Sequence, residues 1–165
     1  MTSGLTRLNT LSERDAEAEL MTCCASPRWA RQVAAGRPYA DADALLGAGR
    51  EASGALDWPD VEQALSAHPA IGERAAGQSR EAGWSRSEQS GMDSADDRTR
   101  TELAAANKAY ADRFGHVFLI CATGLSAERM LAAVSARLGN DQDTERKIVT
   151  DELGKIAALR LEKLL

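Results

Sequence analysis

The sequence predicts an all-α fold: a single-domain helical bundle of about seven to nine helices that extends over residues 1–165. Only 4% of the residues are aromatic, and alanine, the strongest helix former, is plentiful, a mixture that favours helices over strands. Apolar residues also recur at helical spacing between Ser, Asp, Gly and Pro residues of the kind that begin or end helices. A chain of 165 residues accommodates one domain, or two very small ones.

Four helices are expected in the first part of the chain. Each begins at a Ser or Asp cap or at a proline suited to the first helical turn. The expected spans are about residues 12–24, 27–36, 41–53 and 58–67. The last of these ends before His68-Pro69, because the residue that precedes a proline is disfavoured in the α conformation.

The middle stretch, residues 72–97, is rich in Gly, Ser and charged residues and has weak periodicity. A linker is one interpretation of it, but Trp84 and the 85–89 segment argue against a wholly flexible tether. A long helix is then expected over about residues 94–114, with an apolar stripe at helical spacing and Gly115 as its stop.

Residues 117–122 form a short apolar run for which periodicity alone does not separate a buried strand from a continuing helix. The apolar stripe before this run and the helices after it favour helix. Two further helices are expected, one from Ser126 to about residue 138 and one from about residue 144 to the C-terminus.

Composition and charge exclude several classes of protein. The formal net charge of −5 argues against binding of nucleic-acid backbones, which depends on Lys and Arg. No window approaches the 18 or so apolar residues of a membrane span, and the first residues lack the apolar core of a signal peptide. We therefore expect a cytoplasmic protein with no nucleic-acid or membrane partner.

Three cysteines, two of them adjacent (Cys23 and Cys24), do not make a disulfide framework. The chain has no Cys-x-x-Cys motif, and its two histidines are too far apart for zinc-ligand spacing. Buried structural thiols are the expectation for all three cysteines, Cys121 included, and no metal site is expected.

Three positions depart from local patterns. His68 stands at a helix exit forced by Pro69, where its side chain can be held at a fixed angle to a pocket; a capping or core histidine is the alternative. Ser85 and Glu88 have capping-box spacing, so a helix start at Ser85 is the alternative to a functional role. In the last helix, Arg160 falls within roughly 40° of an apolar stripe formed by Val149, Leu153 and Ile156. A buried cation there requires a partner, unless it snorkels to water or interacts with the helix dipole.

These positions fall into a longer pattern in a fixed order. His-Pro-Ala-Ile-Gly at 68–72 is followed by Ser-x-x-Glu-Gln at 85–89, and then by Asn107-x-x-Tyr110-x-x-x-Phe114-Gly115. Phe-Leu-Ile-Cys-Ala at 118–122, Arg-Leu-Gly-Asn at 137–140 and Leu-Arg-Leu at 159–161 complete it. Over nearly its whole length the chain resembles the 2-oxo-4-hydroxy-4-carboxy-5-ureidoimidazoline (OHCU) decarboxylase family of urate breakdown.

The resemblance implies an all-helical homodimer and a carboxy-lyase that converts OHCU to (S)-allantoin and CO2 in purine degradation. It implies no metal and no organic cofactor, since the C=N bond of the substrate can itself take up the electron pair. Transferred residue by residue, the resemblance makes His68 the general acid/base, Glu88 the partner of the substrate hydroxyl and of the imidazole, and Arg160 the binder of the carboxylate or the ureido group. The residues that it implies for substrate binding are Pro69, Ser85, Gln89, Phe118, Leu119, Ile120, Cys121 and Ala122.

Two other classes stay open. One is a non-catalytic helical module that binds a ureide or another protein. The other is a cysteine-dependent hydrolase that uses Cys23 or Cys24, although the sequence has no matching His/Asn motif.

Overall fold

The computed structural model describes residues 2–73 and 75–165. Over these residues the protein has nine α-helices, one 3-10 helix and no strand, which confirms the all-α prediction and its range of helix numbers. The chain divides into two compact units, one made of the residues up to Ala64 together with Thr150–Leu165, the other of Leu65–Val149. The single-domain organisation therefore stays a prediction.

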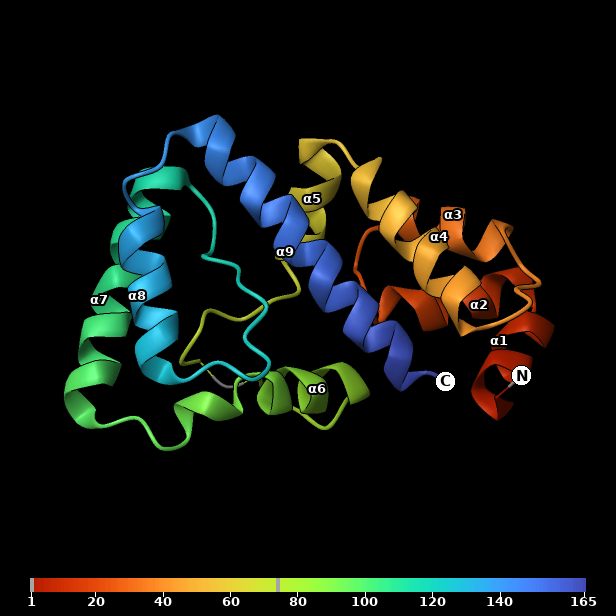
Figure 1. Ribbon diagram of the computed structural model, residues 1–165, viewed down its shortest axis with the longest axis horizontal. Coiled ribbons are helices and arrows are strands. Elements are labelled where there is room, and N and C mark those ends of the chain that lie inside the picture. Colours follow the sequence, from red (N-terminus) through yellow and green to blue (C-terminus); the bar gives the residue numbers. More distant parts are fainter. Residues whose placement is uncertain (1, 74) are drawn as a thin grey trace. The chain divides into compact units, whose positions relative to one another are not determined.

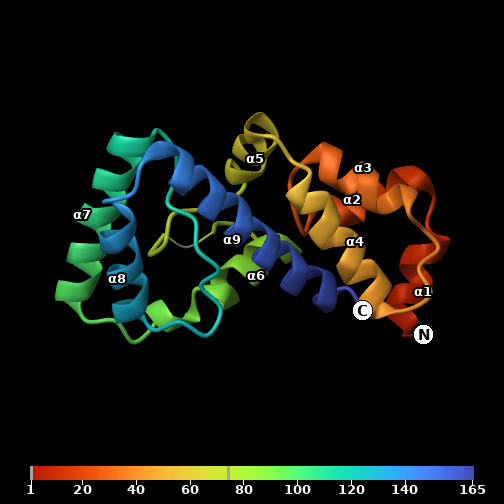
Figure 2. The ribbon, with the colours of Figure 1, turned by 45° about the horizontal axis from the view of Figure 1, so that its top comes forward.

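The first unit contains α1 (Ser3–Thr10), α2 (Glu13–Met21), α3 (Pro27–Ala35), α4 (Ala42–Gly54) and most of α5 (Trp58–Leu65). Helix α3 packs against both α2 and α4, as Figure 2 shows. The last part of α9 (Gln142–Lys163) completes this unit.

The helix starts in the first unit follow the predicted capping chemistry. The hydroxyl of Ser12 accepts a hydrogen bond from Asp15 N at 3.1 Å, and that of Ser26 accepts one from Trp29 N at 3.2 Å. The carboxylate of Asp41 accepts one from Ala44 N at 2.8 Å. These bonds satisfy amide groups that have no partner within the helix.

Two details of the first unit differ from expectation. Helix α2 ends at Met21 rather than near residue 24, because the chain turns there and Cys23 N donates to Leu20 O at 2.9 Å. Helix α1 was not predicted. Its signals are a Thr2 cap, whose hydroxyl accepts from Leu5 N, and two buried leucines three residues apart, Leu5 and Leu8.

The core of the first unit is closely packed around Trp29, which is fully buried. Its indole N–H donates to Gly49 O at 3.0 Å and lies 3.1 Å from Ser53 Oγ. Gly49 also lies close to Leu161 of α9, since a Cβ added at Gly49 would lie 2.6 Å from Leu161 Cδ1. The glycine therefore sets how closely α4 and the end of α9 pack.

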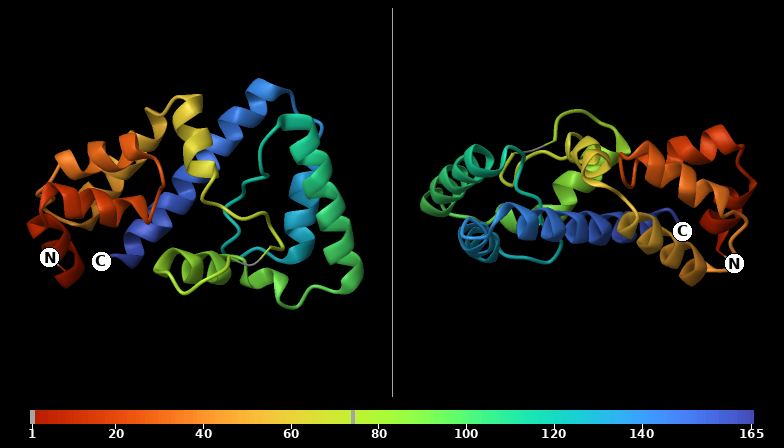
Figure 3. Two further views of the ribbon diagram at one scale, coloured as in Figure 1. Left: turned by 180° about the vertical axis from the view of Figure 1, so that it is seen from behind. Right: turned by 90° about the horizontal axis from the view of Figure 1, so that it is seen from above.

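The second unit contains α6 (Arg80–Glu88), the 3-10 helix η1 (Ser90–Met92), α7 (Asp97–Phe114), α8 (Ala127–Arg137) and the start of α9. Helices α7 and α8 pack against each other and lie side by side from the front and from behind (Figures 1 and 3). Their inner faces form a core with residues of the intervening segments; it includes Met92, Leu103, Tyr110, Phe118 and Met130.

The 72–97 stretch forms α6 and η1, which agrees with the argument from Trp84 and the 85–89 segment against a flexible tether. One expectation for the second unit is wrong: residues 117–122, for which helix was favoured, are neither helix nor strand. Gly115 ends α7 with φ +81°, a left-handed conformation that a helix cannot continue through. Phe118 and Ala122 then pack in this core, and Leu119 is also buried, without regular backbone pairing, so burial rather than secondary structure explains the apolar run.

Candidate functional site

The His68-Pro69 corner follows α5 directly. His68 is half-buried, and its backbone N–H donates to Leu65 O at 3.0 Å. Four residues on, Gly72 adopts φ +93°, a conformation that L side chains rarely adopt. The corner is therefore a turn between these two points, and it follows a helix exit where Pro69 predicted one.

Two distant side chains hold this turn. Gln89 Oε1 accepts a hydrogen bond from Gly72 N at 3.0 Å, and Gln89 Nε2 donates to Ala70 O at 3.5 Å. From the middle of α7, Asn107 Nδ2 donates to Ile71 O at 2.7 Å. The three backbone groups of residues 70–72 are thus fixed by amide side chains of two other segments.

Helix α6 carries the second group of predicted site residues. Ser85 is buried and Glu88 is half-buried, and their spacing places both on one side of the helix. Gln89, also half-buried, is the residue that directly follows the helix. The helix begins earlier than Ser85: the hydroxyl of Ser79 accepts from Ala82 N at 3.1 Å. The capping-box interpretation of Ser85 and Glu88 is therefore wrong, because Ser85 lies within the helix and Glu88 ends it.

The third group, Phe118–Ala122, lies in the irregular segment after α7. Phe118, Leu119 and Ala122 are buried, whereas Ile120 and Cys121 are half-buried. The carbonyl of Leu119 accepts a hydrogen bond from Arg137 Nη1 at 2.7 Å. The partial exposure of Cys121 differs from the buried thiol that was expected for it.

Arg160 lies near the end of α9 and is 6% exposed, on the same buried face as Leu153 and Ile156. Its Nη1 donates to Thr22 O, at the end of α2, at 3.3 Å. Snorkelling requires the charged end to reach water, so the burial of Arg160 argues against that alternative.

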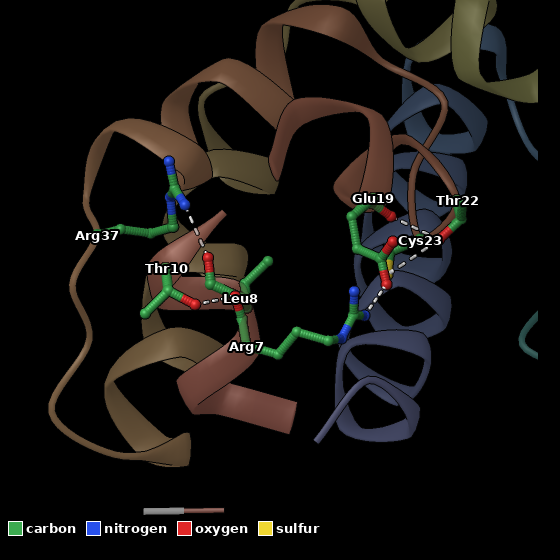
Figure 4. A network of polar contacts seen from close by, with 7 residues as sticks. All are labelled: Arg7, Leu8, Thr10, Glu19, Thr22, Cys23 and Arg37. Carbon is green, nitrogen blue, oxygen red and sulfur yellow. Dashed lines mark hydrogen bonds and ion pairs between the residues drawn. The ribbon is translucent and has the colours of Figure 1, made fainter. Parts of the chain in front are cut away.

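The Thr22 corner that receives Arg160 is itself held in place. The hydroxyl of Thr22 donates to Glu19 O at 2.6 Å, and the carboxylate of Glu19 pairs with Arg7 of α1. Figure 4 shows these contacts, with Cys23 beside the Thr22 hydroxyl. The end of α2 is therefore fixed from two sides.

The adjacent cysteines do not have the properties of a nucleophile. Cys23 and Cys24 are buried. Burial raises the pKa of the Cys24 thiol to about 12, although a backbone hydrogen bond from Ser26 and the charge of Arg160 act in the opposite direction. A thiol with this pKa stays protonated at neutral pH, which disfavours the cysteine-hydrolase alternative for Cys24.

The predicted site residues divide between the two units. The residues from the 68–72 turn, α6 and the 118–122 segment belong to the second unit, and Arg160 belongs to the first. Within the second unit, the structure brings Gln89 to the turn that follows His68. The meeting of His68, Glu88 and Arg160 in one pocket stays a prediction.

A cavity of about 260 Å3 opens in the second unit beside Gln89. It is lined by Gly72, Glu73, Arg86, Gln89, Met92, Asp93 and Arg100. The guanidinium of Arg86 donates to Ala75 O at 2.8 Å and to Gly77 O at 3.1 Å. Gln89 thus contributes both to the turn and to a cavity wall.

Sequence patterns predicted no role for Asn107 or Arg137. Both stand in the motifs that carry the family resemblance, and each makes a buried or half-buried hydrogen bond to a predicted site segment. A polar residue on the apolar stripe of a helix is the available signal, since such a residue requires a partner when it is buried.

No helix among the residues described combines the length and apolar character of a membrane span. Within the same residues, no group of three or more His, Cys, Asp or Glu side chains could hold a metal ion.

The protein is all-helical, and its 68–72 turn, helix α6 and irregular 117–122 segment follow one another in the order of the family pattern. A family model described as OHCU decarboxylase matches residues 9–162. The chain therefore belongs to the OHCU decarboxylase family.

Three relatives support this assignment. The uric acid degradation bifunctional protein TTL of Arabidopsis thaliana is 34% identical over 152 residues, which cover 90% of this chain and 47% of that protein; the chain thus spans about half of its length. The OHCU decarboxylase of Amia calva is 30% identical, over 84% of this chain and 81% of that protein. The OHCU decarboxylase of Haloferax volcanii is 28% identical, over 82% of this chain and 80% of that protein.

Solved structures give the same result. A crystal structure of OHCU decarboxylase in the presence of (S)-allantoin superposes with a TM-score of 0.77 at 31% identity and covers 88% of this chain and 96% of that one. The crystal structure of (S)-allantoin synthase has a TM-score of 0.72 at 17% identity, over 98% of this chain and 54% of that one, and shows the shared fold.

Proposed function

We propose that this chain is a carboxy-lyase that converts OHCU to (S)-allantoin and CO2 in urate degradation, with no metal and no organic cofactor. The observation that carries the proposal is the 68–72 turn. It presents His68 next to Pro69 and is fixed by Gln89 and Asn107, all of them residues of the family pattern. The family match over residues 9–162 supports it.

The substrate carries its own electron sink. When the bond between the ring carbon and the carboxylate breaks, the electron pair forms a double bond to the neighbouring ring carbon. The C=N pair at that carbon moves to nitrogen, which takes up a proton, and CO2 leaves. The resulting enol loses its hydroxyl proton and gains one at the neighbouring carbon, which gives allantoin. The protein supplies binding, orientation and proton transfer.

Stereochemistry requires that this last proton reach one face only. We assign the transfer to His68, because imidazole is the side chain that exchanges protons most readily at neutral pH. Glu88 then binds the substrate hydroxyl and orients the imidazole, and Arg160 holds the carboxylate or ureido group with its planar donors. Pro69, Ser85 and Gln89 line the pocket, and the backbone of residues 118–122 pairs with the polar edge of the ring.

A homodimer and a cytoplasmic location are part of the same proposal. The cysteine pattern, two adjacent thiols and a third far along the chain, makes no disulfide framework and supports a reducing compartment. Light scattering that gives the mass of one chain at working concentrations would contradict the dimer.

The test is the decay of freshly generated OHCU, followed by absorbance, with the wild-type protein and His68→Asn. We expect the wild type to accelerate decay, and the variant to fold normally and lose turnover by about 100-fold or more, the usual scale for a positioned acid/base. Activity should survive exhaustive chelation; loss to EDTA with recovery on adding a divalent metal would contradict the cofactor-free chemistry.

Binding of (S)-allantoin without any acceleration of OHCU decay would instead identify a non-catalytic ureide-binding module. If His68→Asn unfolds and its folded fraction keeps full activity, His68 is a core residue.

A further inference from the structure

A buried polar cluster joins three helices of the second unit. Glu145 near the start of α9 is fully buried, as is Tyr110 of α7, and Arg137 at the end of α8 is 8% exposed. Glu145 Oε1 accepts from Tyr110 Oη at 2.6 Å and from Arg137 Nε at 2.6 Å, and Oε2 accepts from Asn140 Nδ2 at 3.1 Å. Both oxygens of the carboxylate therefore have donors.

The cluster is an ion pair with neutral donors around it. Burial alone would raise the pKa of Glu145, but hydrogen bonds from Arg137, Tyr110 and Asn140 and the charge of Arg137 hold it below its ordinary value. Burial and the hydrogen bond to Glu145 raise the pKa of Tyr110. At neutral pH the carboxylate is charged and the phenol is not, so the Arg137–Glu145 pair is intact.

Arg137 is the member of this cluster that donates a hydrogen bond to the irregular segment, whereas Tyr110 contacts that segment through its ring, edge-to-face with Phe118. The Nη1 of Arg137 donates to Leu119 O at 2.7 Å, and its guanidinium lies over the Phe118 ring, 4.5 Å from the ring centroid. One planar group thus connects the carboxylate of α9 to a backbone carbonyl outside any helix.

Residues 117–122 have no helix or strand ladder to fix the path of their backbone. A directional hydrogen bond from a buried donor therefore contributes strongly to fixing that path. Arginine suits this place because its guanidinium can donate in two directions at once, whereas a lysine ammonium is a point charge on a flexible stem.

We infer that Arg137 is a positioning residue for the reaction: anchored by Glu145, it fixes the backbone of the 118–122 segment for pairing with the substrate ring. This inference rests on the proposed function, because the segment's contact with substrate does. Arg137 itself does not take part in the chemistry.

The test replaces both members of the ion pair, Arg137 and Glu145, by neutral residues. In Arg137→Met/Glu145→Gln, the Leu119 carbonyl loses its donor, while the amide oxygen can still accept from Tyr110 and no buried charge is left unpaired, so the protein is expected to fold. Tyr110→Phe is the matched control, since it weakens the same cluster and leaves the bond to Leu119. Two quantities are measured in both: amide hydrogen exchange of the peptide spanning residues 117–122, and KM and kcat for OHCU decay.

In the double variant we expect exchange of this peptide to accelerate about tenfold or more, the scale of one lost charge-assisted hydrogen bond, and KM to rise by a similar factor with a smaller change in kcat. Tyr110→Phe should stay within about twofold of wild type in both, even though its melting temperature falls. If the double variant does not fold, Arg137→Lys, which keeps a charge for Glu145, should show the same acceleration and the same rise in KM.

Wild-type exchange of the 117–122 peptide in the folded variants would overturn the inference, as would an unchanged KM with faster exchange, or an equal effect of Tyr110→Phe. A wild-type protein without decarboxylase activity would contradict the proposed function, whereas the exchange rates need no turnover and test separately whether Arg137 holds the segment.

Discussion

At the scale of single residues, Arg160 gives the sharpest test of the proposed site. Its guanidinium is buried and donates to Thr22 O. If it binds a planar carboxylate or ureido group with two donors, lysine cannot reproduce the geometry. We expect Arg160→Lys to fold normally and to lose at least about tenfold in kcat/KM, because a charge-assisted contact is worth roughly 1.5–3 kcal/mol.

Arg98→Lys is the control for this substitution. Arg98 is largely exposed and pairs with Glu102 one helical turn away, so kcat/KM should not change. Near-wild-type efficiency in a well-folded Arg160→Lys protein would remove Arg160 from the site.

Glu88 ends α6 and does not cap it, so its charge can be tested without disturbing the helix start. We expect Glu88→Gln to lower kcat while leaving the melting temperature near the wild-type value, because the amide keeps hydrogen bonding and loses only the charge. Ser79→Ala should do the reverse: it removes the cap of α6 and costs about 1 kcal/mol of stability. Equal turnover for Glu88→Gln and wild type would exclude a catalytic role for this carboxylate.

Residue patterns placed His68 at a helix exit forced by Pro69 and Arg160 beside an apolar stripe; in the structure α5 ends before His68, and Arg160 is buried on that stripe. The patterns did not predict what holds the turn after His68. Gln89 reaches Gly72 across 17 positions and Asn107 reaches Ile71 across 36, and tertiary contacts of this kind leave no periodicity in the sequence.

At the scale of elements, the end of α7 sets the path into the 118–122 segment. Gly115 has φ +81°, and a Cβ there would meet no atom within 4 Å, so substitution strains only the backbone. We expect Gly115→Ala to lower the free energy of unfolding by about 1–2 kcal/mol, the cost of a left-handed alanine, as measured by urea denaturation. Gly54→Ala is the control: it also meets open space, at a helix end without a positive φ, and should be neutral or slightly stabilising.

Helix starts were the most predictable elements, because caps are local. Ser26, Asp41 and Ser126 each accept from an amide three residues on. The capping box expected at Ser85 was wrong because Ser-x-x-Glu can also occur within a helix, and the cap of this helix is Ser79. The helix favoured for residues 117–122 was wrong because a segment buried on a core is apolar whatever its backbone conformation.

At the scale of the whole molecule, the buried ion pair predicts sensitivity to acid. The pKa of Glu145 is lower in the folded protein than in the unfolded chain, so its stabilising effect is present above the ordinary pKa of about 4.3 and is lost as pH falls through the folded value. We expect the melting temperature to decrease as the pH is lowered below about 4.5, and to decrease less steeply with pH in Glu145→Gln.

Exposed cap carboxylates such as Asp96 also have a lowered pKa, through hydrogen bonds from Thr99, and contribute to the same acid limb. Asp96→Asn, which keeps a capping side chain, should flatten the limb less than Glu145→Gln. An acid limb that is identical in Glu145→Gln and wild type would show that the buried pair does not control it.

The stereochemistry of the product tests the proposed function of the chain most directly. Freshly generated OHCU should be added to the protein and the circular dichroism of the product recorded as allantoin accumulates. We expect a signal of the (S)-enantiomer that grows with enzyme concentration and disappears with His68→Asn. Racemic allantoin at the spontaneous rate, in the presence of folded wild-type protein, would contradict the account.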